Sequence, residues 1–135
     1  MEKKNIDWSS IGFAYMPTDY RYVSNFKDGK WDEGTLSTDP NIVLNECAGV
    51  LQYSQSVFEG LKAYTTEDGH IVTFRPDLNA ERIAASAARL EMPVFPKERF
   101  IDAVEQVVKA NAAWVPPYGS GATLYLRPYM FGSNA

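Results

Sequence analysis

The residues that most directly suggest chemistry stand near the end of the sequence, in LYLRPYMFG at 124–132. Tyr125 and Arg127 alternate with Leu124 and Leu126, which predicts a strand with the tyrosine and the arginine on one face and the leucines on the other. A guanidinium that is buried without a partner is very costly. We therefore expect Arg127 either to lie on a solvated outer face or to meet a carboxylate. In the second case Arg127 and Tyr125 together could bind an amino or carboxylic acid.

A second arginine stands at a predicted element boundary, in FRPD at 74–77. Arg75 follows a strand-like run and precedes a proline, close to the start of a helix. Arginine binds phosphate through paired hydrogen bonds, and anions settle at helix N-termini. Arg75 is thus a candidate phosphate ligand, although a surface salt bridge would explain it as well.

Aromatic residues gather in LQYSQSVFEGLKAY at 51–64. Tyr53, Phe58 and Tyr64 are expected in the core. Glu59 and Lys62 stand three positions apart, and we expect them to pair along a helix face.

Other catalytic signatures are absent. The sequence has no nucleotide-binding glycine loop, no nucleophile elbow and no zinc-peptidase motif. The single cysteine, Cys47, is expected to be a small buried apolar residue, and the single histidine, His70, a surface residue after a turn. One cysteine and one histidine do not supply the ligands of a zinc site, so we expect no metal.

The elements that must position these residues begin with strands. Residues 20–36 predict a hairpin around the Asp-Gly turn at 28–29, and residues 41–46 predict another short strand. A short helix is expected in the middle of 51–64, ended near Gly60.

LKAY at 61–64 and HIVTF at 70–74 are then expected as two strands joined by the turn TTEDG.

Two amphipathic helices follow these strands. In 79–91, an apolar face forms from Ile83, Ala87 and Leu90, and Asp77 or Asn79 is expected to cap the start. The second helix begins at Pro96, and its stripe consists of Phe100, Val104, Val107 and Val108. Strands, two helices and a final strand indicate an α+β domain rather than a repeated βαβ series.

The composition limits the function classes. The chain has 135 residues, of which 45% are apolar, so it is of single-domain size and can bury a core. A net charge of −4 argues against nucleic-acid binding. No apolar run reaches the roughly 18 residues of a membrane span, and the first residues lack the apolar region of a secretory signal. We therefore expect a soluble cytoplasmic protein without a membrane partner.

Several motifs together resemble one family. LQYSQSVFEGLKAY, FRPDLNAERIAASAARLEMP, NAAWVPP and LYLRPYMFG, in this order and at these spacings, closely resemble the branched-chain amino acid aminotransferases. These belong to the class IV, fold type IV enzymes that use pyridoxal phosphate. The resemblance runs from about Gly12 to the end of the chain.

The resemblance implies a fold and a cofactor. It implies that residues 1–135 form the smaller N-terminal α+β domain, an antiparallel sheet with two main helices packed on it. The cofactor, pyridoxal 5'-phosphate, would lie between this domain and a larger C-terminal one, with its phosphate held partly by Arg75. The complete enzyme would work at least as a homodimer.

The resemblance also implies substrate-binding residues. The substrates would be leucine, isoleucine and valine, glutamate and the corresponding 2-oxo acids. Positions matching the pocket wall are Tyr53, Phe58, Tyr125 and Arg127, and Phe13 by a looser alignment. Arg127 would admit the side-chain carboxylate of glutamate in the second half-reaction.

The Schiff-base lysine of this family belongs to the C-terminal domain. None of the lysines present matches it: Lys3, Lys4, Lys27, Lys30, Lys62, Lys97 and Lys109. We therefore expect this chain to be the N-terminal part of a longer enzyme, without a catalytic residue of its own and inactive as an isolated fragment.

Two alternatives stay open. One is another class IV enzyme, a D-amino acid aminotransferase or an aminodeoxychorismate lyase. The other is a free-standing ligand-binding or dimerisation module that kept the fold and lost catalysis. Retention of Arg75, Tyr125 and Arg127 argues mildly against the module.

Overall fold

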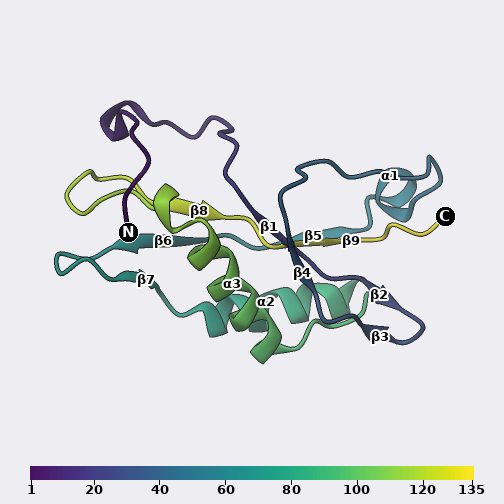
Figure 1. The fold of residues 1–135 in the computed structure, drawn as a ribbon. Coiled ribbons are helices and arrows are strands. Elements are labelled where there is room, and N and C mark those ends of the chain that lie inside the picture. The colour runs from purple at the N-terminus through teal and green to yellow at the C-terminus, as the bar shows by residue number, and fades with distance from the viewer.

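The computed structural model describes residues 1–135, whose short strands all pair in antiparallel fashion (Figure 1). The helices are α1 (Gly49–Tyr53), α2 (Pro76–Arg89) and α3 (Lys97–Ala110), with 3₁₀ turns η1 (Trp8–Ser10) and η2 (Ala112–Trp114). The strands are β1 (Arg21–Val23), β2 (Phe26–Lys27), β3 (Lys30–Trp31), β4 (Thr35–Ser37), β5 (Ser56–Phe58), β6 (Leu61–Thr65), β7 (Ile71–Thr73), β8 (Leu124–Leu126) and β9 (Tyr129–Phe131). The predicted α+β class is confirmed.

A long two-stranded ribbon runs through the centre of the molecule. β5 pairs with β9 and β6 pairs with β8 in one continuous register, so β5–β6 and β8–β9 act as two long strands with a break in the middle (Figure 1). The break comprises Glu59 and Gly60 on one strand and Arg127 and Pro128 on the other. Pro128 interrupts the ladder because it has no backbone N–H to donate. Across the break, the N–H of Glu59 still donates to the Pro128 carbonyl at 2.8 Å. β7 pairs with the other edge of β6 and completes a three-stranded sheet in the order β7-β6-β8.

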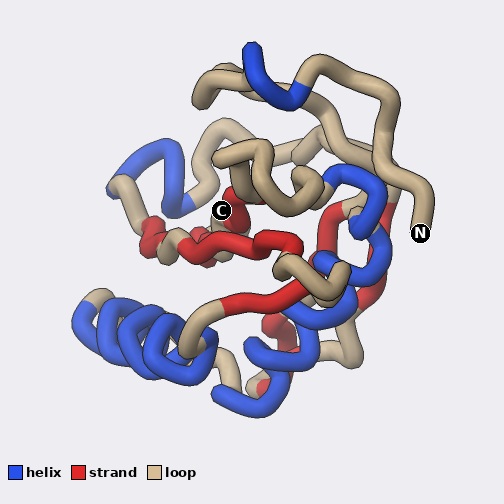
Figure 2. The backbone as a smooth tube through the Cα atoms, turned by 90° about the vertical axis from the view of Figure 1, so that its left-hand side faces the viewer, coloured by secondary structure: helices blue, strands red, loops and turns tan.

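The two long helices cover one face of these strands (Figure 1). α2 and α3 pack together on that face, while the N-terminal segment with η1 lies on the opposite side (Figures 1 and 2). The core between helices and strands consists mainly of Val57, Leu61, Ala63, Ala80, Ile83, Ala87, Met92, Phe100, Val104, Val108, Val115 and Leu126. Because side chains alternate along a strand, burying these strand residues leaves the intervening residues on the open face.

The two long helices differ in how they begin. α3 starts at Lys97 with Pro96 as its N-cap, one residue after the predicted start. α2 starts at Pro76, three residues before the predicted start, and its N-cap is Arg75 in a left-handed conformation (φ 48°, ψ 56°). Asp77 and Asn79 therefore lie inside the first turns, and the prediction that one of them caps the helix is wrong.

The hairpin predicted at 20–36 is confirmed. β1 pairs with β4 and β2 with β3, around the turn at 28–29. One extra residue on the returning side shifts the register between the two pairs, so the hairpin carries a bulge. The Asp32 carboxylate stabilises the bulge by accepting hydrogen bonds from the Asn25 and Gly34 N–H groups at 3.1 and 2.9 Å.

Two local predictions are wrong. Residues 41–46 form no strand, since no neighbouring strand pairs with them and the Asn41 carbonyl accepts a hydrogen bond from the Arg21 side chain at 3.0 Å. The helix expected in the middle of 51–64 lies earlier, because α1 ends at Tyr53 with Ser54 in a left-handed conformation. The residues after Gln55 extend instead as β5 and pair with β9.

Cys47 is exposed, which contradicts the prediction of a buried position. It lies in the turn before α1, where its N–H donates to the Asn45 side-chain oxygen at 2.8 Å. The next residue, Ala48, is fully buried and takes the core position that was expected for the cysteine.

No helix in this structure combines the length and the apolar character that crossing a membrane requires.

Candidate functional site

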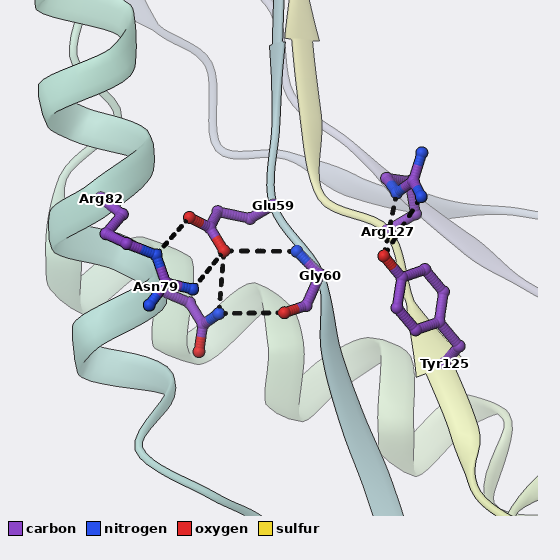
Figure 3. A network of polar contacts seen from close by, with 6 residues as sticks. All are labelled: Glu59, Gly60, Asn79, Arg82, Tyr125 and Arg127. Carbon is purple, nitrogen blue, oxygen red and sulfur yellow. Dashed lines mark hydrogen bonds and ion pairs between the residues drawn. The ribbon is translucent and has the colours of Figure 1, made fainter.

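Tyr125 and Arg127 lie on one face of the ribbon, as the alternation predicted. Leu126 between them is buried against the helices, whereas Arg127 is exposed on the face away from α2 and α3. Figure 3 shows both side chains on the opposite side of the strands from α2. Arg127 therefore lies on a solvated outer face, which is the first of the two positions expected from the sequence. Its contacts on that face are described next.

The Arg127 guanidinium is held by two aromatic residues. Its central carbon lies 4.5 Å from the centre of the Phe58 ring and 5.3 Å from that of the Tyr125 ring. Its Nη2 and Nε donate to the Tyr125 hydroxyl at 3.1 and 3.3 Å. Cation–π contacts of this kind contribute about 0.5–1 kcal/mol at exposed positions. Arg127 is thus oriented without a carboxylate partner, and its remaining N–H groups stay available for one.

Phe13 joins the same group from the N-terminal segment. Its ring packs edge-on against Tyr125, with ring centres 5.2 Å apart. Phe13 and Phe58 are nevertheless 81% and 62% exposed, so their outer surfaces are not covered by this chain. The structure therefore brings together four of the five predicted substrate-binding residues on an open aromatic face.

The fifth residue, Tyr53, lies apart from this group. It ends α1, is 85% exposed and makes no ring contact with the others. With Ser54, Gln55 and Leu90 it lines a separate surface hollow of about 330 Å³. The expectation that Tyr53, Phe58 and Tyr64 belong to the core is wrong, since all three are exposed.

Arg75 meets a carboxylate of its own chain. Its Nε and Nη2 donate to the two carboxylate oxygens of Asp77 at 3.0 and 2.9 Å. These paired hydrogen bonds lower the pKa of Asp77 to about 2 and raise the pKa of Arg75. The Arg75 side chain remains about half exposed. The surface salt bridge considered from the sequence is therefore present, and the Arg75 side chain is still partly accessible at the start of α2.

Glu59 pairs with α2 and not with Lys62. Its carboxylate, 9% exposed, accepts two hydrogen bonds of 2.8 Å from Arg82 and one of 2.9 Å from Asn79 (Figure 3). The Arg82 hydrogen bond, which outweighs the opposing effect of burial, holds the pKa of Glu59 below its usual value. The predicted Glu59–Lys62 pair is wrong because the two residues lie on opposite faces of an extended strand.

Sequence reasoning missed three residues of the open face. Tyr129 pairs with Phe58 across the ribbon, Lys62 pairs with Tyr125, and Gly60 lies opposite Arg127. The period-two alternation that placed Arg127 would also have placed Tyr129. Gly60 was missed because a helix was expected to end near it. Lys62 belongs to the predicted strand at 61–64, but its facing partner Tyr125 depends on the pairing with β8, which the sequence does not show.

Comparisons with known proteins agree on one group of enzymes. No protein-family model matches the chain. A branched-chain-amino-acid aminotransferase of Haemophilus influenzae is 54% identical over 129 residues, which cover 96% of this chain and 38% of the relative. A methionine aminotransferase of Arabidopsis thaliana is 48% identical, over 96% of this chain and 37% of the relative. This chain thus spans little more than a third of the length of these relatives.

Solved structures share the fold. A branched-chain amino acid aminotransferase complexed with N-(5'-phosphopyridoxyl)-L-glutamate matches 90% of this chain and 35% of its own chain, with a TM-score of 0.67 and 25% identity. The branched-chain aminotransferase of the archaeon Thermoproteus uzoniensis, with norvaline, matches 85% of this chain and 34% of its own, with a TM-score of 0.61 and 25% identity. In sequence and in fold, this chain therefore belongs with the N-terminal part of the branched-chain amino acid aminotransferases.

Proposed function

We propose that this chain is the N-terminal part of a transaminase that moves the amino group of leucine, isoleucine or valine to 2-oxoglutarate. The 54% identity to a relative of that name supports the activity. The coverage of little more than a third of that relative supports a second, larger domain in the working enzyme. We propose residues 1–135 as the small domain, working in the cytoplasm within a homodimer or larger assembly.

The arrangement of Arg127 on Phe58 and Tyr125 is the observation that carries this proposal. A branched aliphatic side chain binds best against desolvated aromatic walls. Glutamate needs a cation in the same space for its side-chain carboxylate. An arginine that is stacked on one ring and anchored to a neighbouring hydroxyl lies flat along the wall, so the same surface serves both substrates.

Phe13 adds a third ring to this wall through its contact with Tyr125. Tyr53, which lies apart within this chain, has its exposed ring free to complete a pocket with residues from elsewhere in the assembly. The open aromatic face would then become enclosed when the larger domain covers it.

The residues around Arg75 fit the phosphate of pyridoxal 5'-phosphate. Arg75 is half exposed at the start of α2, where backbone N–H groups favour an anion, although Asp77 occupies one edge of its guanidinium. Arg75 would therefore hold the phosphate through its outer edge. When bound, pyridoxal phosphate supplies the electron sink of transamination, and a lysine of the larger domain supplies its attachment.

Exchange of Arg127 for alanine in the complete enzyme tests the proposal. We expect the KM for glutamate to rise by about 10- to 100-fold, as for the loss of a charge-assisted hydrogen bond of ~1.5–3 kcal/mol, and the KM for leucine to change little. Unchanged glutamate kinetics would refute the role of Arg127. The purified 135-residue chain should form no 2-oxo acid from leucine and 2-oxoglutarate, and turnover by this chain alone would refute the two-domain proposal.

Methionine is a second candidate substrate. The methionine aminotransferase of Arabidopsis thaliana is 48% identical to this chain, close to the identity of the branched-chain enzyme. An unbranched thioether packs well against aromatic rings, so the wall described above accepts it too. Comparing kcat/KM for leucine and methionine in the complete enzyme decides between them.

A further inference from the structure

A buried polar network lies behind the strand that carries Phe58, and the proposed function makes no use of it. The Glu59 carboxylate points toward α2, away from the open face, and binds Arg82 and Asn79 (Figure 3). Arg82 is 62% exposed at its own side chain, whereas Glu59 is almost fully enclosed. A buried ion pair of this kind adds little net stability, because the desolvation of the charges offsets their attraction. Its position in the fold points to a different role.

The network holds the backbone of Gly60. The Asn79 amide donates to the Gly60 carbonyl at 3.1 Å, and the Gly60 N–H donates to the Glu59 carboxylate at 3.3 Å. In an antiparallel pair, alternate residues turn their backbone groups away from the partner strand. The N–H of Glu59 bonds across the ribbon, so the groups of Gly60 point away from it. Asn79 of α2 and the Glu59 carboxylate, which α2 holds through Arg82 and Asn79, therefore supply the partners that a further strand would otherwise provide.

On the open face, the Tyr125 hydroxyl packs directly against Gly60. A Cβ atom at position 60 would lie 2.2 Å from the Tyr125 hydroxyl oxygen and 2.9 Å from the ring carbon that bears it. Only glycine permits this approach. From this place above Gly60, the same hydroxyl accepts the hydrogen bonds of Arg127.

We propose that Glu59, Asn79 and Arg82 are positioning residues for Arg127, acting through the backbone of Gly60 and the Tyr125 hydroxyl. The network fixes the backbone of Gly60 from the side of α2. The fixed backbone determines where the Tyr125 hydroxyl packs, and the hydroxyl orients the Arg127 guanidinium by accepting its hydrogen bonds. The inference rests on the proposed function, because it assigns these residues to recognition of the substrate carboxylate.

The first test measures Arg127 in the 135-residue chain itself, without cofactor or activity. Hydrogen exchange of the Arg127 Nε–H, followed by NMR, reports its hydrogen bond to Tyr125. In Glu59→Gln and in Gly60→Ala we expect this exchange to accelerate roughly tenfold, the factor for loss of a charge-assisted hydrogen bond. Glu81→Gln is the matched control, since Glu81 forms an ion pair with Lys97 on the exposed side of α2 and takes no part in the network. It should leave the exchange rate unchanged.

The second test separates this inference from the proposed function. In the complete enzyme, Glu59→Gln should raise the KM for glutamate about tenfold while the KM for leucine and the kcat change far less. If Arg127→Ala raises the glutamate KM and Glu59→Gln does not, the positioning role is overturned and the proposed function stands. If Arg127→Ala has no effect, the proposed role of Arg127 in recognition of the substrate carboxylate fails, and the NMR result still decides whether the network orients Arg127.

Folding of each variant is checked by thermal unfolding before these measurements. Glu59→Gln keeps the side-chain shape, so it remains informative if Gly60→Ala does not fold. A folded Glu59→Gln chain with unaltered Arg127 exchange would overturn the inference.

Discussion

Arg127 and Phe58 belong to opposite strands of one ribbon, and the guanidinium of the first lies 4.5 Å from the ring centre of the second. Such a contact leaves the charge accessible while restricting its direction. A lysine in place of Arg127 would keep the charge but lose both the planar contact with the ring and the two-atom hydrogen bond to Tyr125. The surrounding residues therefore orient the Arg127 guanidinium, which a charge alone would not achieve.

Removal of the Tyr125 hydroxyl should weaken recognition of the substrate carboxylate. In Tyr125→Phe the ring stays while the acceptor for Arg127 is lost. We expect the KM for glutamate to rise roughly three- to tenfold in the complete enzyme, and the KM for leucine to change less, because the aromatic wall is kept. Steady-state kinetics of both half-reactions measure this. Tyr118→Phe, at an exposed position in the loop before β8, is the control and should leave both values unchanged.

The stability of the chain should fall in acid, partly through Asp77. Its folded-state pKa is about 2, below the usual 3.8, because Arg75 donates to its carboxylate. A depressed carboxyl pKa stabilises the folded state above the unfolded-state pKa, and this stabilisation is lost as the pH falls through the folded-state value. We expect Asp77→Asn to flatten the decline in the free energy of unfolding between those two pH values. Urea unfolding at a series of pH values measures the slope.

Glu67→Gln serves as the control for this measurement, since Glu67 is exposed and has no polar partner in the structure. A slope that is the same in Asp77→Asn and in the unmodified chain would contradict the prediction.

Gly34 should tolerate alanine less well than Gly29 does. Both have positive φ, +76° and +80°, so alanine strains the backbone at either position by about 1–2 kcal/mol. A Cβ at Gly34 would also lie 2.0 Å from the Tyr22 hydroxyl oxygen, whereas nothing lies within 4 Å at Gly29. We expect Gly34→Ala to lower the free energy of unfolding by roughly 1 kcal/mol more than Gly29→Ala. Equal losses in urea unfolding would show that Tyr22 moves aside without cost.

Truncation on the buried side of α2 should be much more costly than truncation at its end. Ile83 is 4% exposed within the core, while Leu90, expected from the sequence on the same apolar face, is 42% exposed. We expect Ile83→Ala to lower the free energy of unfolding by about 2–5 kcal/mol, and Leu90→Ala by less than about half as much. Chemical unfolding of the two variants measures the difference. A loss at Leu90 as large as that at Ile83 would contradict the burial seen here.

The sequence predicted long-range organisation best where one simple period dominated. Alternation in LYLRP was enough to place Tyr125 and Arg127 on one face, and helical spacing was enough to find α2 and α3. The helix start at Arg75 was harder, since an arginine in a left-handed conformation has no propensity signal. The prediction that Cys47 is buried was wrong for a similar reason, because only the folded structure shows that Ala48, and not Cys47, faces the core.

The site itself was only partly predictable. Family resemblance named four residues of the open face, but it could not give the contact of Arg127 with Phe58 or the separation of Tyr53. Glu59 was predicted to pair with Lys62, because a helix was expected where a strand forms. Contacts between residues distant in sequence, such as Glu59 with Arg82, depend on the fold and carry no local signature.

The ribbon has a consequence for how the chain acquires its structure during synthesis. β6 pairs with β7, its neighbour in the sequence. The other edge of β6 and all of β5 pair with β8 and β9, which are synthesised only after both long helices. Contacts at such separation close slowly, because loop entropy is lost before they form. On the ribosome, β5, β6 and α2 therefore emerge well before their last partner. Until Leu126 arrives, the apolar edge of β6 stays open to chaperones and to other nascent chains.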